Sequence, residues 1–193
     1  MSNNIRLKKG LDIPVAGQAA LQCERTVIGD VVAVSGCEFR ALVPRLLVKE
    51  GDSVLCGTPI LADKKRPEIL FTSPVSGTVK AVVRGEKRKL IEVQIQTDGQ
   101  QAAIDFGKKD IDALSAAEVK DALLQSGLWP SFVQRPYGII ANPEDTPDAI
   151  FVSAFSTAPL AADIDFCCKD EVRNIQARSI QAQGIVERKP PEM

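Results

Sequence analysis

The fold is decided by two short stretches, VKEGDSV at residues 48–54 and SPVSGTV at residues 73–79. Each stretch has a glycine, which adopts a positive φ angle at a tight turn without steric cost. Beside it stands a short polar residue that can bond back to nearby backbone amides, and β-branched valines suited to a small core flank the turn. These residues are Gly51 and Gly77, Asp52 and Ser76, and Val48, Val54 and Val79.

Short strand-like runs surround these turns and are separated by Gly, Asp, Ser and Pro, which is the spacing of an all-β domain. The run that ends at Gln96 alternates apolar and polar residues, as a half-buried strand does. We expect strands at residues 26–35, 46–48, 54–55, 59–61, 69–72, 78–83 and 89–96. With its two turns, this half of the chain resembles the lipoyl and biotinyl carrier domains, which implies a barrel-sandwich hybrid.

A carrier domain presents a lysine at the tip of an exposed hairpin, and Lys64 and Lys65 are the candidates here. A lipoyl domain shows a single lysine behind an acidic residue and closer to the Ser-Pro turn, whereas a biotinyl domain shows methionine on both sides. The tip, DKKRPE at residues 63–68, matches neither pattern. The alternatives are a modified lysine and a solvated basic hairpin, and we favour the second.

The second half of the chain reads as α/β. Ser115 with Glu118 forms a capping box before a helix at residues 116–125, and Gly127 supplies its stop. We expect a strand at residues 149–155. The tail after Val172 is expected to form a short polar helix with a frayed end. One helix and one strand do not close a doubly wound sheet, so we expect an incomplete α/β domain. The predicted fold class is therefore α+β and multi-domain, with a β domain at residues 1–100 and a partial α/β domain at residues 101–193.

Composition excludes several kinds of function. Lys and Arg number 24 against 25 Asp and Glu, so no overall charge draws the chain to nucleic acid. The absence of histidine excludes Ser-His and Cys-His nucleophiles, and we identify no catalytic residue. The five cysteines lack Cys-x-x-Cys spacing, which predicts small buried residues and no metal site. The absence of an apolar run of membrane-spanning length or a signal peptide predicts a cytoplasmic location.

Several motifs together are similar to the A subunit of the sodium-translocating NADH:quinone oxidoreductase, over about residues 5–165. They are IRLKKGLDIPVAG at 5–17, DKK at 63–65, FTSPVSG at 71–77, RGEKR at 84–88, SGLW at 126–129, RP at 135–136 and PLAA at 159–162. Their number and order make this match more specific than the carrier-like turns alone.

The resemblance implies a non-catalytic peripheral subunit of a six-subunit respiratory complex that oxidises NADH, reduces ubiquinone and transports sodium. It implies a place on the cytoplasmic face of the bacterial inner membrane, in contact with the membrane subunits and with ubiquinone. This chain would bind no cofactor, while NAD, FAD, FMN and iron-sulfur centres would belong to other subunits.

The second domain also resembles the flavin- and NADH-binding subunit of complex I and the C subunit of the Rnf complex, which approach a phosphate with a glycine-rich loop. Here that loop, residues 126–132, has one glycine followed by Leu, Trp and Phe. We therefore expect nucleotide binding to be lost and Trp129 to act as a packing anchor between the domains.

The resemblance associates residues 35–42 and 135–140 with the quinone region. Our candidate contacts are Phe39, Arg135, Pro136 and Tyr137, since an aromatic face suits a quinone ring and a guanidinium can donate to its carbonyl oxygens. The alternative is that the aromatic residues belong to the core or an interface and that Arg135 caps a loop.

A basic cluster on two hairpins, formed by Lys64, Lys65, Arg66, Arg84, Lys87, Arg88 and Lys89, suits docking to a partner or to lipid headgroups, or is a solvated face. Two other functions also remain open: a lipoyl or biotin carrier modified at Lys64 or Lys65, and a flavin-dependent NADH dehydrogenase.

Overall fold

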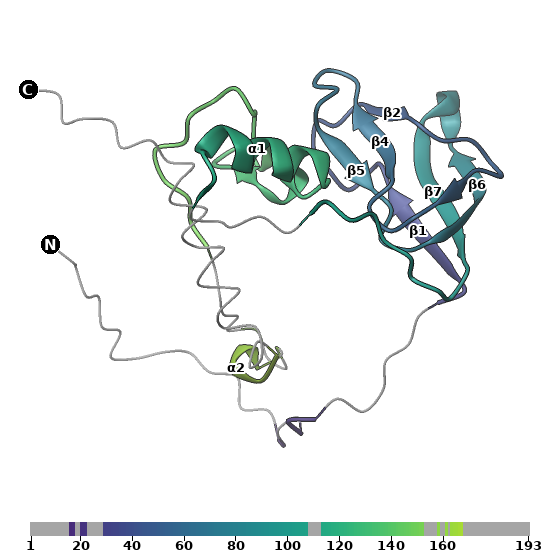
Figure 1. Ribbon diagram of the computed structural model, residues 1–193, viewed down its shortest axis with the longest axis horizontal. Helices are drawn as coiled ribbons and strands as arrows, with labels where there is room; N and C mark the ends of the chain where they lie inside the picture. Colours follow the sequence, from purple (N-terminus) through teal and green to yellow (C-terminus); the bar gives the residue numbers. More distant parts are fainter. Residues whose placement is uncertain are drawn as a thin grey trace, which may run out of the picture.

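The computed structural model describes residues 16–17, 20–22, 29–107, 113–152, 158, 161 and 163–167. Within them the N-terminal half forms two antiparallel sheets (Figure 1). The strands are β1 (Val31–Ser35), β2 (Pro44–Leu46), β3 (Ser53–Val54), β4 (Pro59–Asp63), β5 (Leu70–Thr72), β6 (Gly77–Arg84) and β7 (Leu90–Thr97). One sheet has the order β1-β7-β6-β3 and the other β2-β4-β5. The barrel-sandwich hybrid is confirmed.

The core lies between the two sheets because alternate residues of each strand point inward. In β7, Val93 and Ile95 are buried and Gln96 is exposed, as the alternation predicts. At the start of the strand the order is reversed, with Leu90 buried and Ile91 exposed, where the pairing with β6 shifts register between Val83 and Arg84. The predicted core valines Val48, Val54 and Val79 are also buried. They join Ile60, Leu61, Ile69 and Phe71 in one cluster.

The two turns form as predicted for their glycines. Gly51 and Gly77 both have positive φ, and a Cβ at position 77 would collide with the backbone oxygen of Gln96. Asp52 accepts a hydrogen bond from the Lys49 amide at 2.7 Å, which is the local bond expected. Ser76 makes no such bond within its own turn. Its hydroxyl donates to the Asp98 carboxylate and accepts from the amide of Ala102, both in the segment after β7.

The second half contains α1 (Ala116–Gln125), the 3₁₀ turn η3 (Trp129–Ser131), the hairpin of β8 (Val133–Gln134) and β9 (Ile139–Ile140), and α2 (Ile164–Cys167). Helix α1 has the predicted bounds and capping box, because the Ser115 side chain accepts from the Glu118 amide and Glu118 bonds back to the Ser115 amide. Val119 is buried and Leu123 packs against the core, as their spacing predicts.

The expected strand at residues 149–155 is wrong over its described part. Residues 149–152 have no strand pairing, and Phe151 is 93% exposed. A strand needs a neighbour to satisfy its backbone amides, and none lies beside these residues in the described part of the chain. Residues 153–157 and the tail predicted after Val172 lie outside the described residues, as does the start of the strand expected from Thr26.

The cysteines also differ from expectation where the structure describes them. Cys37 and Cys167 are exposed and Cys56 is partly buried, while Cys23 and Cys168 lie outside the described residues. The Cys37 thiol lies in the loop after β1 and donates to the Leu90 carbonyl at 3.4 Å, so a surface hydrogen bond replaces core burial.

The two halves share one core. Trp129 and Ile140 belong to the same buried cluster as Ile69 and Phe71 of the sandwich. The Trp129 indole is 5% exposed and donates to the Ala141 carbonyl at 2.9 Å. The role of Trp129 as a packing anchor is therefore confirmed. The turn η3, which contains Trp129, contacts both β5 and β9, and α1 lies on the β5 side of the sandwich (Figure 1).

Candidate functional site

Three connecting segments meet at one end of the sandwich. They are the β1–β2 loop (residues 36–43), the β4–β5 loop (residues 64–69) and the β8–β9 turn (residues 135–138). The amide of Gly36 donates to the Ile91 carbonyl at 3.0 Å, which ties the first loop to β7. The amide of Lys64 donates to the Val43 carbonyl at 2.8 Å, which ties the second loop to the first.

The first loop also reaches the β8–β9 turn. The Arg40 guanidinium donates from Nη1 to the carbonyl oxygen of Tyr137 at 3.3 Å, across 97 positions of sequence. Phe39, the preceding residue, is partly buried, and its ring packs edge-on against Phe71 with centroids 4.9 Å apart. The contact with Phe71 anchors the loop to the core, and Arg40 extends from it to the hairpin.

The β8–β9 turn presents the other predicted site residues to solvent. It contains a cis peptide between Arg135 and Pro136, and the Gly138 amide closes it on the Gln134 carbonyl at 2.9 Å. Arg135, Pro136 and Tyr137 are all exposed, Tyr137 to 63%. Tyr137 is therefore not a core residue, and the Arg135 side chain makes no hydrogen bond to the described part of the chain. Both are free to meet a ligand or a partner.

The β4–β5 tip, where a carrier domain would present its modified lysine, is held by hydrogen bonds. Asp63, only 1% exposed, forms an ion pair with Arg66 (Nε to Oδ2, 3.2 Å) and accepts from the Lys65 amide at 3.1 Å. Arg66 also donates from Nη1 to the Ile140 carbonyl at 3.3 Å. The tip is thereby clamped to the second half of the chain, which is the opposite of a mobile carrier arm. Lys64 and Lys65 are exposed beside this clamp.

The loop at residues 126–132 packs against the sandwich. The Thr72 hydroxyl donates to the Ser126 carbonyl at 3.3 Å, and a Cβ added at Gly127 would lie 2.6 Å from the Thr72 side chain. Trp129 and Phe132 pack together with ring centroids 5.3 Å apart. A pyrophosphate needs open backbone amides, and here the space is taken by side chains.

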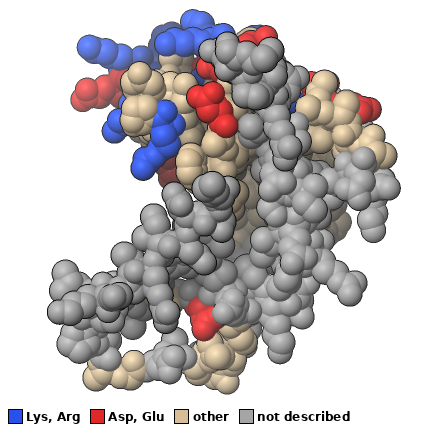
Figure 2. Space-filling view, turned by 90° about the vertical axis from the view of Figure 1, so that its left-hand side faces the viewer, with Lys and Arg blue, Asp and Glu red and all other residues tan. Residues whose placement is uncertain are grey.

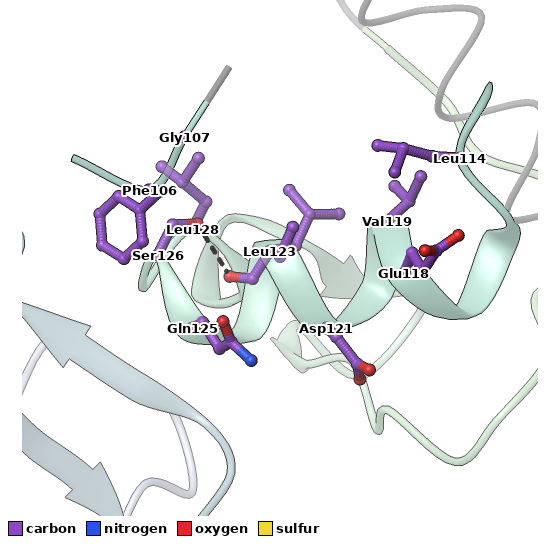
Figure 3. Close-up of a pocket in the computed structure, with 11 residues that line it drawn as sticks. Phe106, Gly107, Leu114, Glu118, Val119, Asp121, Leu123, Gln125, Ser126 and Leu128 are labelled. Carbon is purple, nitrogen blue, oxygen red and sulfur yellow. Dashed lines mark hydrogen bonds between the residues drawn. The ribbon is translucent and has the colours of Figure 1, made fainter. Parts of the chain in front are cut away.

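A depression of about 430 Å³ runs along α1 (Figure 3). Apolar side chains form much of its lining, namely Phe106, Leu114, Val119, Leu123 and Leu128. The carboxylate of Glu118 is occupied in the capping box, and Asp121 is the other acidic residue of the lining. The depression holds no nucleophile paired with a base, and it includes none of the site residues predicted from sequence.

The described residues contain no group of three or more Cys, Asp or Glu arranged to hold a metal ion. At the opposite end of the sandwich, hydrogen bonds from the Ser76 hydroxyl and then from the Gln100 amide lower the pKa of the Asp98 carboxyl. The described helices include none with the length and apolarity needed to cross a membrane.

Sequence reasoning did not predict the contacts by which Arg40 and Arg66 organise this end of the sandwich. Both act by donating to carbonyl oxygens far away in the sequence. The only local signal was the spacing of Asp63 and Arg66, three residues apart in a turn.

The fold is thus a barrel-sandwich hybrid whose β4–β5 tip is tied by Arg66 to a following α/β segment, which is a two-domain architecture of the carrier-like class. Family models agree with both halves. The NqrA N-terminal barrel-sandwich hybrid domain matches residues 5–98, and the NqrA second alpha/beta domain matches residues 114–183.

Curated relatives point to the same family. The A subunit of the Na(+)-translocating NADH-quinone reductase of Pseudomonas aeruginosa (strain UCBPP-PA14) is 38% identical over 176 residues, which are 90% of this chain and 39% of that protein. The proteins of the same name from Haemophilus influenzae (strain PittGG) and Actinobacillus pleuropneumoniae serotype 5b (strain L20) are each 40% identical over 169 residues. Those residues are 86% of this chain and 38% and 37% of the respective relatives. The chain belongs to the NqrA family, and it spans about two fifths of the length of these relatives.

Proposed function

We propose that this chain acts as a non-catalytic peripheral subunit of a sodium-translocating NADH:quinone oxidoreductase and contributes to its quinone site. The names of the relatives support the complex. In this proposal the chain lies on the cytoplasmic face of the bacterial inner membrane and docks on the membrane subunits of a six-subunit assembly. It binds no cofactor itself, and NAD, FAD, FMN and iron-sulfur centres belong to the other subunits.

The contact between Arg40 and Tyr137 carries the quinone part of the proposal. It brings the β1–β2 loop beside the β8–β9 turn, so two stretches far apart in sequence form one surface. That surface offers an exposed tyrosine ring and an exposed guanidinium, Arg135. A ring can stack on a quinone, and a guanidinium can donate to the quinone carbonyl oxygen. Phe39 serves this surface from behind, because it packs the loop onto Phe71.

The other two functions receive less support. A carrier needs a free hairpin tip, whereas Arg66 ties this tip to the Ile140 carbonyl. A flavin-dependent dehydrogenase needs an open phosphate loop, whereas Gly127 lies against Thr72.

The proposal is tested with Tyr137→Ala and Arg135→Gln in the assembled complex that contains the full-length protein. We expect the KM for ubiquinone to rise about 2- to 10-fold for Tyr137→Ala, because an aromatic contact contributes about 0.5–1.5 kcal/mol. Arg135→Gln is expected to raise it about tenfold or more, since hydrogen bonds from charged groups contribute about 1.5–3 kcal/mol. NADH oxidation by an artificial electron acceptor should not change.

Phe151→Ala is the matched control, because Phe151 is exposed and lies outside this end of the sandwich. Unchanged ubiquinone kinetics in both site variants, with the complex still assembled, would refute the quinone role.

A further inference from the structure

Exposed basic side chains gather at the same end of the sandwich. They come from four segments: Arg40 in the β1–β2 loop, Lys64 and Lys65 in the β4–β5 loop, Arg84, Lys87, Arg88 and Lys89 at the β6–β7 hairpin, and Arg135 in the β8–β9 turn. We call this set the basic end. The exposed carboxylates on the same segments are fewer, namely Glu38, Glu68 and Glu86.

Hydrogen bonds between the segments hold the basic end together. Loop 36–43 lies in the middle, because Gly36 and Cys37 bind the start of β7 while Val43 binds the Lys64 amide. Arg40 joins the β8–β9 turn to this loop, because its guanidinium donates to the Tyr137 carbonyl. Figure 2 shows Lys and Arg side chains gathered at the top of the molecule, where the hairpin ends lie in Figure 1.

The opposite end of the sandwich carries negative charge. Asp30, Asp52 and Asp98 are exposed there, next to the ends of β7 and β6. Because the net charge of the whole chain is −1, attraction to an anionic partner must come from a local group of cations such as the basic end. The field of such a group orients a protein toward an anionic partner.

We propose that the basic end docks on the anionic headgroups of a phospholipid membrane. Four projecting hairpins and loops spread the positive charge over a broad area, which suits a lipid surface better than a single acidic peptide. In the described part of the chain the one ion pair joins Arg66 to Asp63, so no cation of the basic end is paired with a described carboxylate.

The aromatic residue of this end supports the same partner. Tyr137 is 63% exposed and lies beside Arg40, Pro136 and Arg135. Tyrosine with basic neighbours is the composition found at the headgroup level of membranes. Each Lys or Arg near an anionic leaflet strengthens binding several-fold, and salt screens the attraction.

Vesicle co-sedimentation of the whole chain tests the proposal. Phosphatidylglycerol mixed with phosphatidylcholine should bind the chain, pure phosphatidylcholine should not, and added salt should release it. The double variants Lys64→Gln/Lys65→Gln and Lys87→Gln/Lys89→Gln should each weaken binding by about tenfold. The control Lys49→Gln/Lys80→Gln removes the same charge from exposed lysines elsewhere and should change binding by less than about twofold.

Equal binding to both kinds of vesicle, or equal losses in the control and the test variants, would overturn the proposal. Binding to polyglutamate but not to the anionic vesicles would overturn it in favour of an acidic protein partner. The test is independent of the quinone site, since the four lysines take no part in it and ubiquinone kinetics are a separate measurement.

Discussion

Ser76 and Asp98 connect two turns of the sandwich. Ser76 is only 1% exposed. Its hydroxyl donates to Asp98 Oδ1 at 2.6 Å and accepts from the Ala102 amide at 3.0 Å. Its hydrogen bond is the main cause of the lowered pKa of Asp98. A polar side chain that is buried in a β core is thus satisfied by residues that follow β7.

At the residue scale we predict that Ser76→Ala raises the pKa of Asp98 toward its ordinary value of 3.8. Because the folded-state pKa is lowered, the bond stabilises the fold above the unfolded-state pKa and loses its effect as the pH falls through the folded-state pKa. The variant should therefore have a lower urea midpoint at neutral pH, and the difference from the parent chain should shrink in acid. Urea unfolding from neutral pH down to below the pKa of Asp98 measures the change in midpoint, and an NMR titration of Asp98 measures the change in its pKa.

Asp98→Asn provides the control, because an amide oxygen still accepts from Ser76 but does not titrate. In that background the cost of Ser76→Ala should not vary with acid pH. A cost that still varied with pH in the Asp98→Asn background would show that another group is responsible.

Helix α1 ends in a bond pattern that also fixes its contact with the sandwich. The Leu128 amide donates to the Leu123 carbonyl at 3.1 Å and the Gly127 amide to the Leu124 carbonyl at 3.2 Å, with Gly127 at φ +72°. This is a Schellman motif, which requires a residue in the left-handed region. The same glycine lies against Thr72 of β5. The helix stop and the packing of the two halves therefore depend on one position.

At the element scale we predict that Gly127→Ala destabilises the chain more than Gly138→Ala. Both glycines have positive φ, so each alanine costs about 1–2 kcal/mol in conformation. Only Gly127 also faces a neighbour, since nothing lies within 4 Å of a Cβ at Gly138. Overpacking against Thr72 should add about 1–3 kcal/mol, measured as the free energy of unfolding in urea.

When Thr72→Ala is combined with Gly127→Ala, part of the lost free energy of unfolding should be recovered. The reason is that Thr72→Ala removes the two atoms closest to the new methyl group. If the two single glycine variants were equally stable, the contact between α1 and β5 would contribute nothing at this position.

The described parts of the two halves pack on one core, and the charged side chain of Arg66 joins them. Arg66 pairs with the buried Asp63 of the sandwich and reaches the Ile140 carbonyl of the second half. Trp129 lies in the core that both halves share. The fluorescence of the single tryptophan therefore follows the contact between the halves, while circular dichroism follows the secondary structure of the whole chain.

At this scale we predict that Arg66→Gln lowers the urea midpoints of both signals together. Removing one partner of a buried ion pair costs about 3–5 kcal/mol, and we expect about 2–3 kcal/mol because Arg66 is partly exposed and the Lys65 amide still binds Asp63. Lys65→Gln is the matched control and should leave both midpoints unchanged. Tryptophan fluorescence that changed well before circular dichroism in the unaltered chain would mean that the halves unfold independently.

Sequence patterns predicted correctly those elements whose ends are fixed by hydrogen bonds between residues close in sequence. The bounds of α1 follow from Ser115 and Glu118 at one end and Gly127 at the other, and all of these bonds lie within five residues. The strand expected at residues 149–155 is absent over residues 149–152, because a local stretch of sequence does not supply a pairing partner. The exposed Cys37 was also mispredicted, since a cysteine in a surface loop has the same composition signal as one in a core.

By itself, the sequence determined the turn positions, the helix ends and the absence of histidine chemistry, because each depends on residue type or on neighbours a few positions apart. Tertiary structure alone decided that Arg40 meets Tyr137, that Arg66 clamps the carrier-like tip and that basic side chains gather at one end. These contacts join residues as far as 97 positions apart. The packing of the sheets and the helix sets them, and no pattern within one segment encodes which distant carbonyl a side chain reaches.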